Sequence, residues 1–303
     1  MSGEAARTGN PIVVEGVLLP ITTNLAAALA HVWSVTDCEY LWADALCINQ
    51  SDTPEKNHQV PLMRHIYGRS SRVLMWLGDA SDDSDLAMQF LREWAGAIRG
   101  AVDELRRNDK AIYLDGDLTA DNAWVHDPEE RAKASAAANS IFAQFPAPFA
   151  TRAFDDRSWG TVGALFGRSY WTRIWILQEV VLANVATVMC GAKTLDLDDL
   201  IDVLPMFTVM IFCVLVASPA DTGRLLNLMH FDTAAFLVIH SMRSMTREEI
   251  PYILDLACYT TDYEATDARD RIFALLGLIP EGATSIVPNY SLQCPAGLYR
   301  CRG

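Results

Sequence analysis

The spacing of three short apolar runs constrains the fold of this chain most strongly. The runs occupy residues 40–46, 72–78 and 185–190, and segments with helical periodicity separate them. Each run has the length of a buried strand, and strands that alternate with helices form parallel sheets whose ligands bind beyond the carboxyl ends of the strands. We therefore predict an α/β fold with a parallel sheet flanked by helices, with Asp44 near the carboxyl end of the first strand.

Signals for other elements lie between and before these strands. Residues 12–19 predict a short hairpin, and Asp52-Thr-Pro-Glu55 predicts the start of a helix that Pro61 then kinks. Residues 82–107 and 171–183 also have helical periodicity. A further helix, capped by Thr23 or Asn24, is expected to bury one face, made of Leu25, Leu29, Val32 and Trp33.

The chain is expected to hold one α/β domain and a helical extension. The domain spans residues 12–191 and contains an acidic insertion at about residues 104–158. Residues 192–303 form the extension, which is mainly helical. The apolar stretch at residues 203–217 contains a proline and is too short to span a membrane, so a buried helix is predicted there.

Charge narrows the range of partners. The 24 basic and 38 acidic side chains leave a net charge of −14, which argues against nucleic acid and anionic membranes as partners. Residues 79–130 hold 14 acidic and five basic side chains, whereas residues 55–78 hold Lys56 and three arginines against one glutamate. This basic stretch leaves room for a small anionic ligand. Seven dispersed cysteines and no signal peptide predict reduced thiols and a cytoplasmic protein, and no metal site is expected among the scattered histidines.

Several blocks of sequence carry a family resemblance. Residues 41–50 read Leu-Trp-Ala-Asp-Ala-Leu-Cys-Ile-Asn-Gln, and residues 73–78 read Val-Leu-Met-Trp-Leu-Gly. Further blocks lie at residues 24–29, 55–67, 175–183, 190–191 and 266–278. In this order they resemble the heterokaryon incompatibility (HET) domain of filamentous fungi. The family usually begins with a strand of the type Tyr-x-x-Leu-Ser-Tyr-x-Trp-Gly, which is absent before Ile12, so a truncated chain is expected.

The resemblance also implies a chemistry. HET domains look like distant relatives of TIR domains, which have a flavodoxin-like fold and some of which cleave NAD at the nicotinamide glycosidic bond. The catalytic glutamate of those enzymes is commonly set in Trp-x-x-x-Glu, so the resemblance assigns catalysis to Glu179, four residues after Trp175. A carboxylate there would stabilise the oxocarbenium-like ribose as nicotinamide leaves. The alternative is a structural ion pair between Glu179 and Arg173 or a more distant arginine.

The same resemblance places the substrate. Asp44, Asn49 and Gln50 would form a loop over the nucleotide, with Trp175 beside it. NAD is then a substrate, and no cofactor is expected. The alternative for the loop is structural, with Asp44 accepting backbone hydrogen bonds and Asn49 satisfying a turn. Tryptophans such as Trp175 more often belong to the core.

Three functions remain open from the sequence. The resemblance implies a protein of fungal self/non-self recognition that triggers programmed cell death, acting as an NAD glycohydrolase. A second interpretation is a non-catalytic signalling module that associates with itself or with other incompatibility proteins. A third is an inert truncated paralogue.

Overall fold

The computed structural model describes residues 11–35, 39–81, 83–107, 156–201, 239, 242–243 and 253–292. The chain divides into two compact units, each assembled from separate stretches of sequence. Unit 1 comprises Met1–Ala80, Ser169–Lys193 and Met242–Gly303, and unit 2 comprises Ser81–Arg168 and Thr194–Ser241. All residues proposed from the sequence for the site lie in unit 1.

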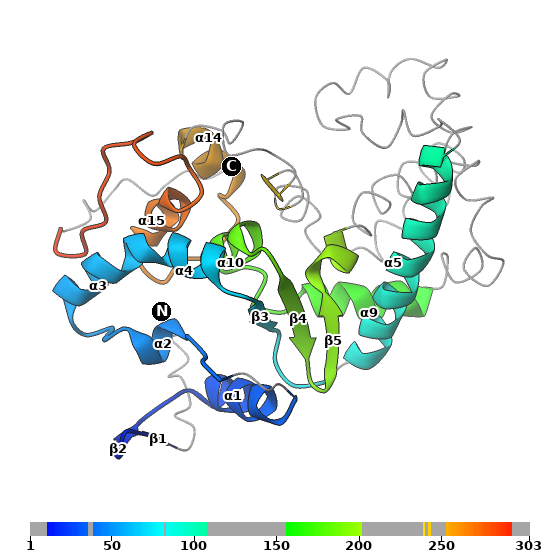
Figure 1. The fold of residues 1–303 in the computed structure, drawn as a ribbon, viewed down its shortest axis with the longest axis horizontal. Helices are drawn as coiled ribbons and strands as arrows, with labels where there is room; N and C mark the ends of the chain where they lie inside the picture. The colour runs from blue at the N-terminus through cyan, green and yellow to red at the C-terminus, as the bar shows by residue number, and fades with distance from the viewer. Residues whose placement is uncertain are drawn as a thin grey trace. The chain divides into compact units, whose positions relative to one another are not determined.

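Unit 1 contains a parallel pair of strands. Strands β3 (Val73–Trp76) and β4 (Ala186–Cys190) pair in register from Val73↔Ala186 to Trp76↔Met189. Every residue of β4 is buried, which explains its unbroken apolar run. Two of the three predicted strands and a mixed α/β architecture are therefore confirmed (Figure 1).

The strand predicted at residues 40–46 is wrong. The run ends in a short helix, α2 (Asp44–Cys47), which starts at Asp44. The N–H groups of Cys47 and Ile48 donate to the carbonyls of Ala43 and Asp44, four residues earlier. These backbone groups therefore form helical hydrogen bonds and not the bonds between strands that a sheet requires. Tyr40 and Leu41 at the start of the run are exposed, so it also lacks the two buried faces of a central parallel strand.

The capping box sets the start of the next helix, and the proline sets its end. Helix α3 (Thr53–Gln59) begins where an Asp52 side-chain oxygen accepts a hydrogen bond of 3.0 Å from the Glu55 N–H. Pro61 lies in a 3-10 turn, η1 (Val60–Leu62), and α4 (Met63–Arg69) continues from it. The predicted cap and the predicted interruption by proline are both confirmed.

A hairpin precedes these helices. Strands β1 (Ile12–Val14) and β2 (Val17–Leu19) pair in antiparallel fashion, as predicted. Glu15 and Gly16 connect them, and both have positive φ angles, of 50° and 80°. This two-residue turn matches the right-handed twist of the flanking strands.

Helix α1 (Thr23–Val35) follows the hairpin. Its cap is Thr22, whose hydroxyl oxygen accepts a hydrogen bond of 3.2 Å from the Leu25 N–H, one residue earlier than predicted. Val32 is buried, but Trp33 is 87% exposed, so its assignment to the buried face is wrong. Adjacent helical positions point about 100° apart, and Trp33 falls just outside the buried stripe.

The last segments of unit 1 pack on helix α10. This helix spans Ile176–Leu182 and contacts α4 and α15 (Asp270–Leu276), while α15 also contacts α14 (Ile253–Tyr259) (Figure 1). The buried Gln178 side chain donates from Nε2 to the Ala274 carbonyl over 2.8 Å. Helix α10 is thus fixed from two sides, and it carries Glu179.

Unit 2 is built on helix α5 (Ser84–Arg107), which confirms the helix predicted at residues 82–107, and on α9 (Asp156–Phe166). These two helices pack together. Strand β5 (Lys193–Asp196), which the sequence did not predict, begins at the last residue of the middle stretch of unit 1. Most of the acidic insertion and the apolar stretch at 203–217 lie outside the described residues. No helix in the described ranges is long and apolar enough to cross a membrane.

Candidate functional site

Glu179 lies on α10 among buried neighbours. Ile176, Leu177 and Val180 of the same helix are fully buried, whereas Glu179 itself keeps partial access to solvent. Its carboxylate oxygen Oε2 accepts a hydrogen bond of 2.6 Å from the phenol of Tyr170. Tyr170 was not predicted from the sequence as a partner of this carboxylate.

The groups around Glu179 shift the pKa of its carboxyl group in opposite directions. Burial raises the pKa of its carboxyl group, while the positive charge of Arg173 and the hydrogen bond from Tyr170 lower the pKa. The negative charge of Asp44 raises the pKa further. The net result is a raised pKa. Arg173 thus acts on Glu179 through its charge, and the hydrogen bond comes from Tyr170 instead.

Two buried tyrosines complete this cluster. Burial and the Glu179 carboxylate raise the pKa of Tyr170 well above its usual value, and the same causes raise the pKa of Tyr67. Tyr67 comes from α4, and its ring meets Trp42 edge-on at 5.9 Å between centroids. Both phenols are therefore neutral hydrogen-bonding groups at neutral pH.

Asp44 lies close enough to Glu179 to act on its pKa, although Asp44 begins helix α2 and does not belong to a strand. Its charge raises the pKa of both Glu179 and Tyr67. Its side-chain oxygen Oδ1 accepts from the N–H of Ala45, and its carbonyl accepts from Nε2 of Gln50 over 3.1 Å. The backbone contact anticipated in the structural alternative is therefore present as well.

Asn49 and Gln50 hold the loop that follows α2. The side-chain oxygen of Asn49 accepts from the Ser51 N–H over 3.1 Å, which closes a local turn, and the Asn49 N–H donates to Glu55 over 2.9 Å. Both Asn49 and Gln50 are exposed. Asn49 thus has the turn role of the structural alternative, while Gln50 reaches a cavity.

Trp175 belongs to an aromatic cluster rather than to an open surface. The buried core of the cluster is Val60, Met63 and Tyr290. The side chains packed against this core are Trp42, Tyr67, Trp175 and Phe273. Trp175 therefore contributes to core packing, as tryptophans commonly do.

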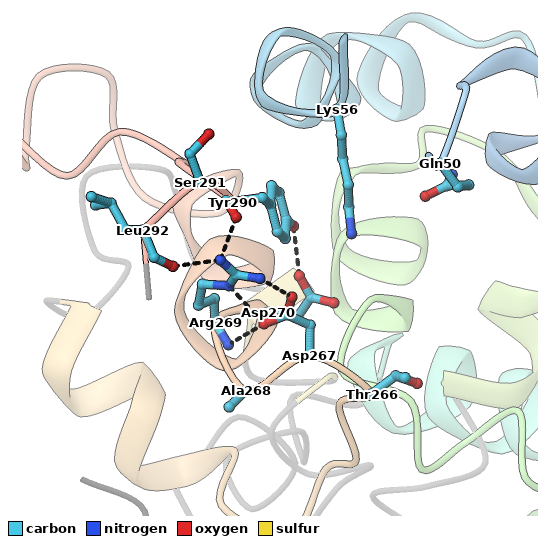
Figure 2. A pocket seen from close by; sticks show the side chains of 10 residues that line it. All are labelled: Gln50, Lys56, Thr266, Asp267, Ala268, Arg269, Asp270, Tyr290, Ser291 and Leu292. Atoms are coloured by element: carbon cyan, nitrogen blue, oxygen red, sulfur yellow. Dashed lines mark hydrogen bonds and ion pairs between the residues drawn. The ribbon is translucent and has the colours of Figure 1, made fainter. Parts of the chain in front are cut away.

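Tyr290 also lines an open pocket of about 920 Å³. Figure 2 shows its lining, which consists of Gln50, Lys56, residues 266–270 and residues 290–292. Of the residues proposed from the sequence for the site, only Gln50 lines this pocket. Lys56, which also lines the pocket, belongs to the basic stretch at residues 55–78 but was not proposed as a site residue from the sequence.

Arg269 organises one wall of the pocket. Its guanidinium donates to both carboxylate oxygens of Asp267, over 2.9 and 2.6 Å, and to the carbonyls of Tyr290 and Leu292. The Tyr290 hydroxyl donates to the Asp270 carboxylate over 2.6 Å. These bonds and the ion pair with Asp267 tie residues 266–270 to the Tyr290 segment. The partner at Tyr290 was not predicted, because 20 residues separate it from Asp270.

No group of three or more potential metal ligands occurs in the described part of the chain.

Comparison with known proteins places the chain in a family. No solved structure matches it. Heterokaryon incompatibility protein 6, OR allele, of Neurospora crassa is 26% identical over 298 residues, which are 90% of this chain and 40% of that protein. The chain thus spans about 40% of the length of this curated relative. The family model for heterokaryon incompatibility protein (HET) matches residues 2–179, more than half of the chain, so the chain belongs to the HET family.

Proposed function

We propose that this chain acts in fungal heterokaryon incompatibility, as a cytoplasmic protein of self/non-self recognition whose activation leads to programmed cell death. Family membership and the printed name of the Neurospora relative support this proposal. That relative is much longer than this chain, so the activity of the whole protein is part of the proposal.

We further propose that the chemical step is cleavage of NAD at the nicotinamide glycosidic bond, within a TIR-like fold. One observation carries this assignment. The carboxylate of Glu179, a residue that is half-buried as a whole, is held by the Tyr170 phenol and lies within the electrostatic reach of Asp44. A fixed carboxylate of this kind stabilises positive charge as it develops, because its position costs no reorganisation during the reaction.

The proposed reaction needs NAD, one water molecule and the Glu179 carboxylate, and its bonds and protons balance. The bond between ribose C1′ and the nicotinamide nitrogen breaks, and its electron pair stays on nitrogen, which releases neutral nicotinamide. The oxocarbenium-like ribose left behind is stabilised by the Glu179 carboxylate. Water then adds to C1′ and loses its proton to Glu179, whose raised pKa suits it to accept a proton. The products are ADP-ribose, nicotinamide and one proton.

The test is NAD turnover by the purified full chain, at high concentration or after induced oligomerisation. Release of nicotinamide is expected, and Glu179→Gln should abolish it while leaving the fold intact. Glu281→Gln is the matched control, because that side chain is 71% exposed and its ion pairs within the described residues, with Arg64 and His65, are long at 3.8 and 3.7 Å. Equal turnover by the Glu179→Gln variant would exclude this catalytic role.

A second candidate is a non-catalytic module that assembles with itself or with other incompatibility proteins. The observation in its favour is the exposed apolar surface near the start of the described chain. Val13, Val17 and Leu18 of the hairpin are each about 60% exposed or more, and Trp33 of α1 is more exposed still. Under this function, Glu179→Gln keeps toxicity in the fungus, whereas Val13→Asp with Leu18→Asp abolishes both toxicity and association.

A further inference from the structure

The pocket beside Tyr290 has a rigid floor. The Tyr290 N–H donates to Asn57 Oδ1 over 2.6 Å, and its hydroxyl donates to Asp270. Arg269 holds the carbonyls of Tyr290 and Leu292. The backbone and the ring of Tyr290, which form the floor of the pocket, are thus held by Asn57, Asp270 and Arg269. The open pocket of about 920 Å³ is large enough for a nucleotide-sized ligand.

Lys56 supplies the pocket with a positive charge, which acts at longer range on Asp267 and helps to lower the pKa of that carboxyl group. Its Nζ lies 3.9 Å from the centroid of the Tyr290 ring, a cation–π contact. Within the described residues, no carboxylate oxygen lies within 4.0 Å of this ammonium group, whereas Arg269 is engaged by Asp267 and by two carbonyls. Figure 2 shows the Lys56 side chain reaching from α3 into the open space. A single compact cation of this kind suits one phosphate group.

The remaining polar groups suit hydroxyls. Asp270 accepts from Tyr290 through Oδ1, which leaves its second carboxylate oxygen as a further acceptor. Gln50 and Thr266 face the same space (Figure 2). Carboxylates commonly bind ribose hydroxyls in nucleotide sites. The negative charges of Asp267 and Asp270 disfavour a highly charged ligand such as a triphosphate.

We propose that this pocket binds the phosphate and ribose of a nucleotide, with Lys56 on the phosphate and Asp270 on a ribose hydroxyl. This proposal extends the proposed NAD cleavage by naming a binding site for part of the substrate. It rests on the proposed function only for the statement that the bound nucleotide belongs to the substrate. The site itself stands on the geometry of Lys56, Tyr290 and Asp270.

The pocket and the Glu179 cluster are linked through shared residues. Gln50 lines the pocket and donates to the carbonyl of Asp44, whose charge acts on Glu179. Tyr290 of the pocket and Tyr67 of the Glu179 cluster belong to one aromatic cluster. Bound in this way, the nucleotide portion of the substrate is held beside Gln50, which is hydrogen-bonded to Asp44.

The test measures binding separately from turnover. The full chain carrying Glu179→Gln is titrated calorimetrically with ADP-ribose, ribose 5-phosphate and inorganic phosphate. ADP-ribose and ribose 5-phosphate should bind, and phosphate alone more weakly. Because a hydrogen bond to a charged group is lost, Lys56→Met should weaken binding about tenfold or more. Lys56→Arg keeps the charge and should retain binding.

Lys193→Met is the matched control, because Lys193 is exposed on β5 and does not line the pocket. Equal affinity in the Lys56→Met and Lys193→Met variants would overturn the proposal, as would an absence of ADP-ribose binding. Equal affinities for phosphate and ribose 5-phosphate would overturn the role of Asp270. If Lys56→Met does not fold, Lys56→Arg together with a fall in affinity at high salt decides the role of the charge. Nucleotide binding without NAD turnover would support this site and refute the proposed catalysis.

Discussion

The Tyr170 phenol donates a hydrogen bond of 2.6 Å to the Glu179 carboxylate, nine residues further along the chain. Tyr170 is itself buried, so this bond is the one direct stabilising contact of the carboxylate that comes from a side chain of the described residues. The bond stabilises the ionised form of Glu179, whereas burial opposes it. Because burial prevails, the ionised carboxylate destabilises the folded state, and this has a measurable consequence.

Glu179→Gln should increase stability at neutral pH but not in acid. A carboxyl whose pKa is raised in the folded state favours folding while it is protonated, and this contribution is lost as the pH rises through the folded pKa. Melting temperatures of the wild type and of Glu179→Gln should therefore nearly coincide below about pH 4, the range of the unfolded glutamate pKa, and diverge above it. A variant that melts below the wild type at pH 8 would show that the ionised carboxylate is needed for folding.

Tyr170→Phe should raise the pKa of Glu179 further. Removing the phenol hydroxyl removes a bond that lowers this pKa, while the burial that raises it remains. The titration can be followed by NMR of the ¹³C-labelled Glu179 carboxyl. Tyr259→Phe is the control, because Tyr259 is 62% exposed, and the pKa of Glu179 should not change in that variant. A lower pKa in Tyr170→Phe would contradict the assignment of this bond.

Local signals in the sequence were sufficient for much of the secondary structure. Asp52 and Glu55 marked the start of α3 because a helix cap depends on residues only three apart. Pro61 interrupts the helix because its ring is incompatible with the preceding turn. By contrast, residues 40–46 share the composition of a strand but end in a helical turn. Composition alone does not distinguish the two structures in so short a run.

The candidate site depends on contacts that local patterns do not contain. Asn57 and Tyr290 form a hydrogen bond across 233 residues, and that bond and Arg269 position the Tyr290 segment, which lines the pocket. Glu179 and Asp44 were both named from the resemblance, and their electrostatic coupling arises although Asp44 begins the short helix α2 and not the predicted strand. Family motifs thus identified the residues, while the tertiary structure determines their partners.

Gly277→Ala should destabilise the protein. A Cβ at Gly277 would lie 2.5 Å from the Gln178 side chain, which is buried and held by the Ala274 carbonyl. Because Gln178 is buried and would have to give up this hydrogen bond to move aside, overpacking should lower the free energy of unfolding by about 1–3 kcal/mol in urea denaturation. Gly96→Ala is the matched control: nothing lies within 4 Å of that Cβ, and helix propensity should raise stability by about 1 kcal/mol. Similar stabilisation by both substitutions would mean that Gln178 can move aside.

Arg269→Lys should release the segment that forms the pocket floor. A lysine keeps the charge, but it cannot donate at once to both Asp267 oxygens and to the carbonyls of Tyr290 and Leu292. Loss of these bonds should cost about 2–4 kcal/mol of stability and increase hydrogen exchange at the Tyr290 amide. Arg271→Lys is the control, because Arg271 makes one exposed bond, to the Thr261 carbonyl, and should cost less than about 0.5 kcal/mol. Unchanged exchange at Tyr290 in Arg269→Lys would show that Asn57 and Asp270 hold this segment without the guanidinium.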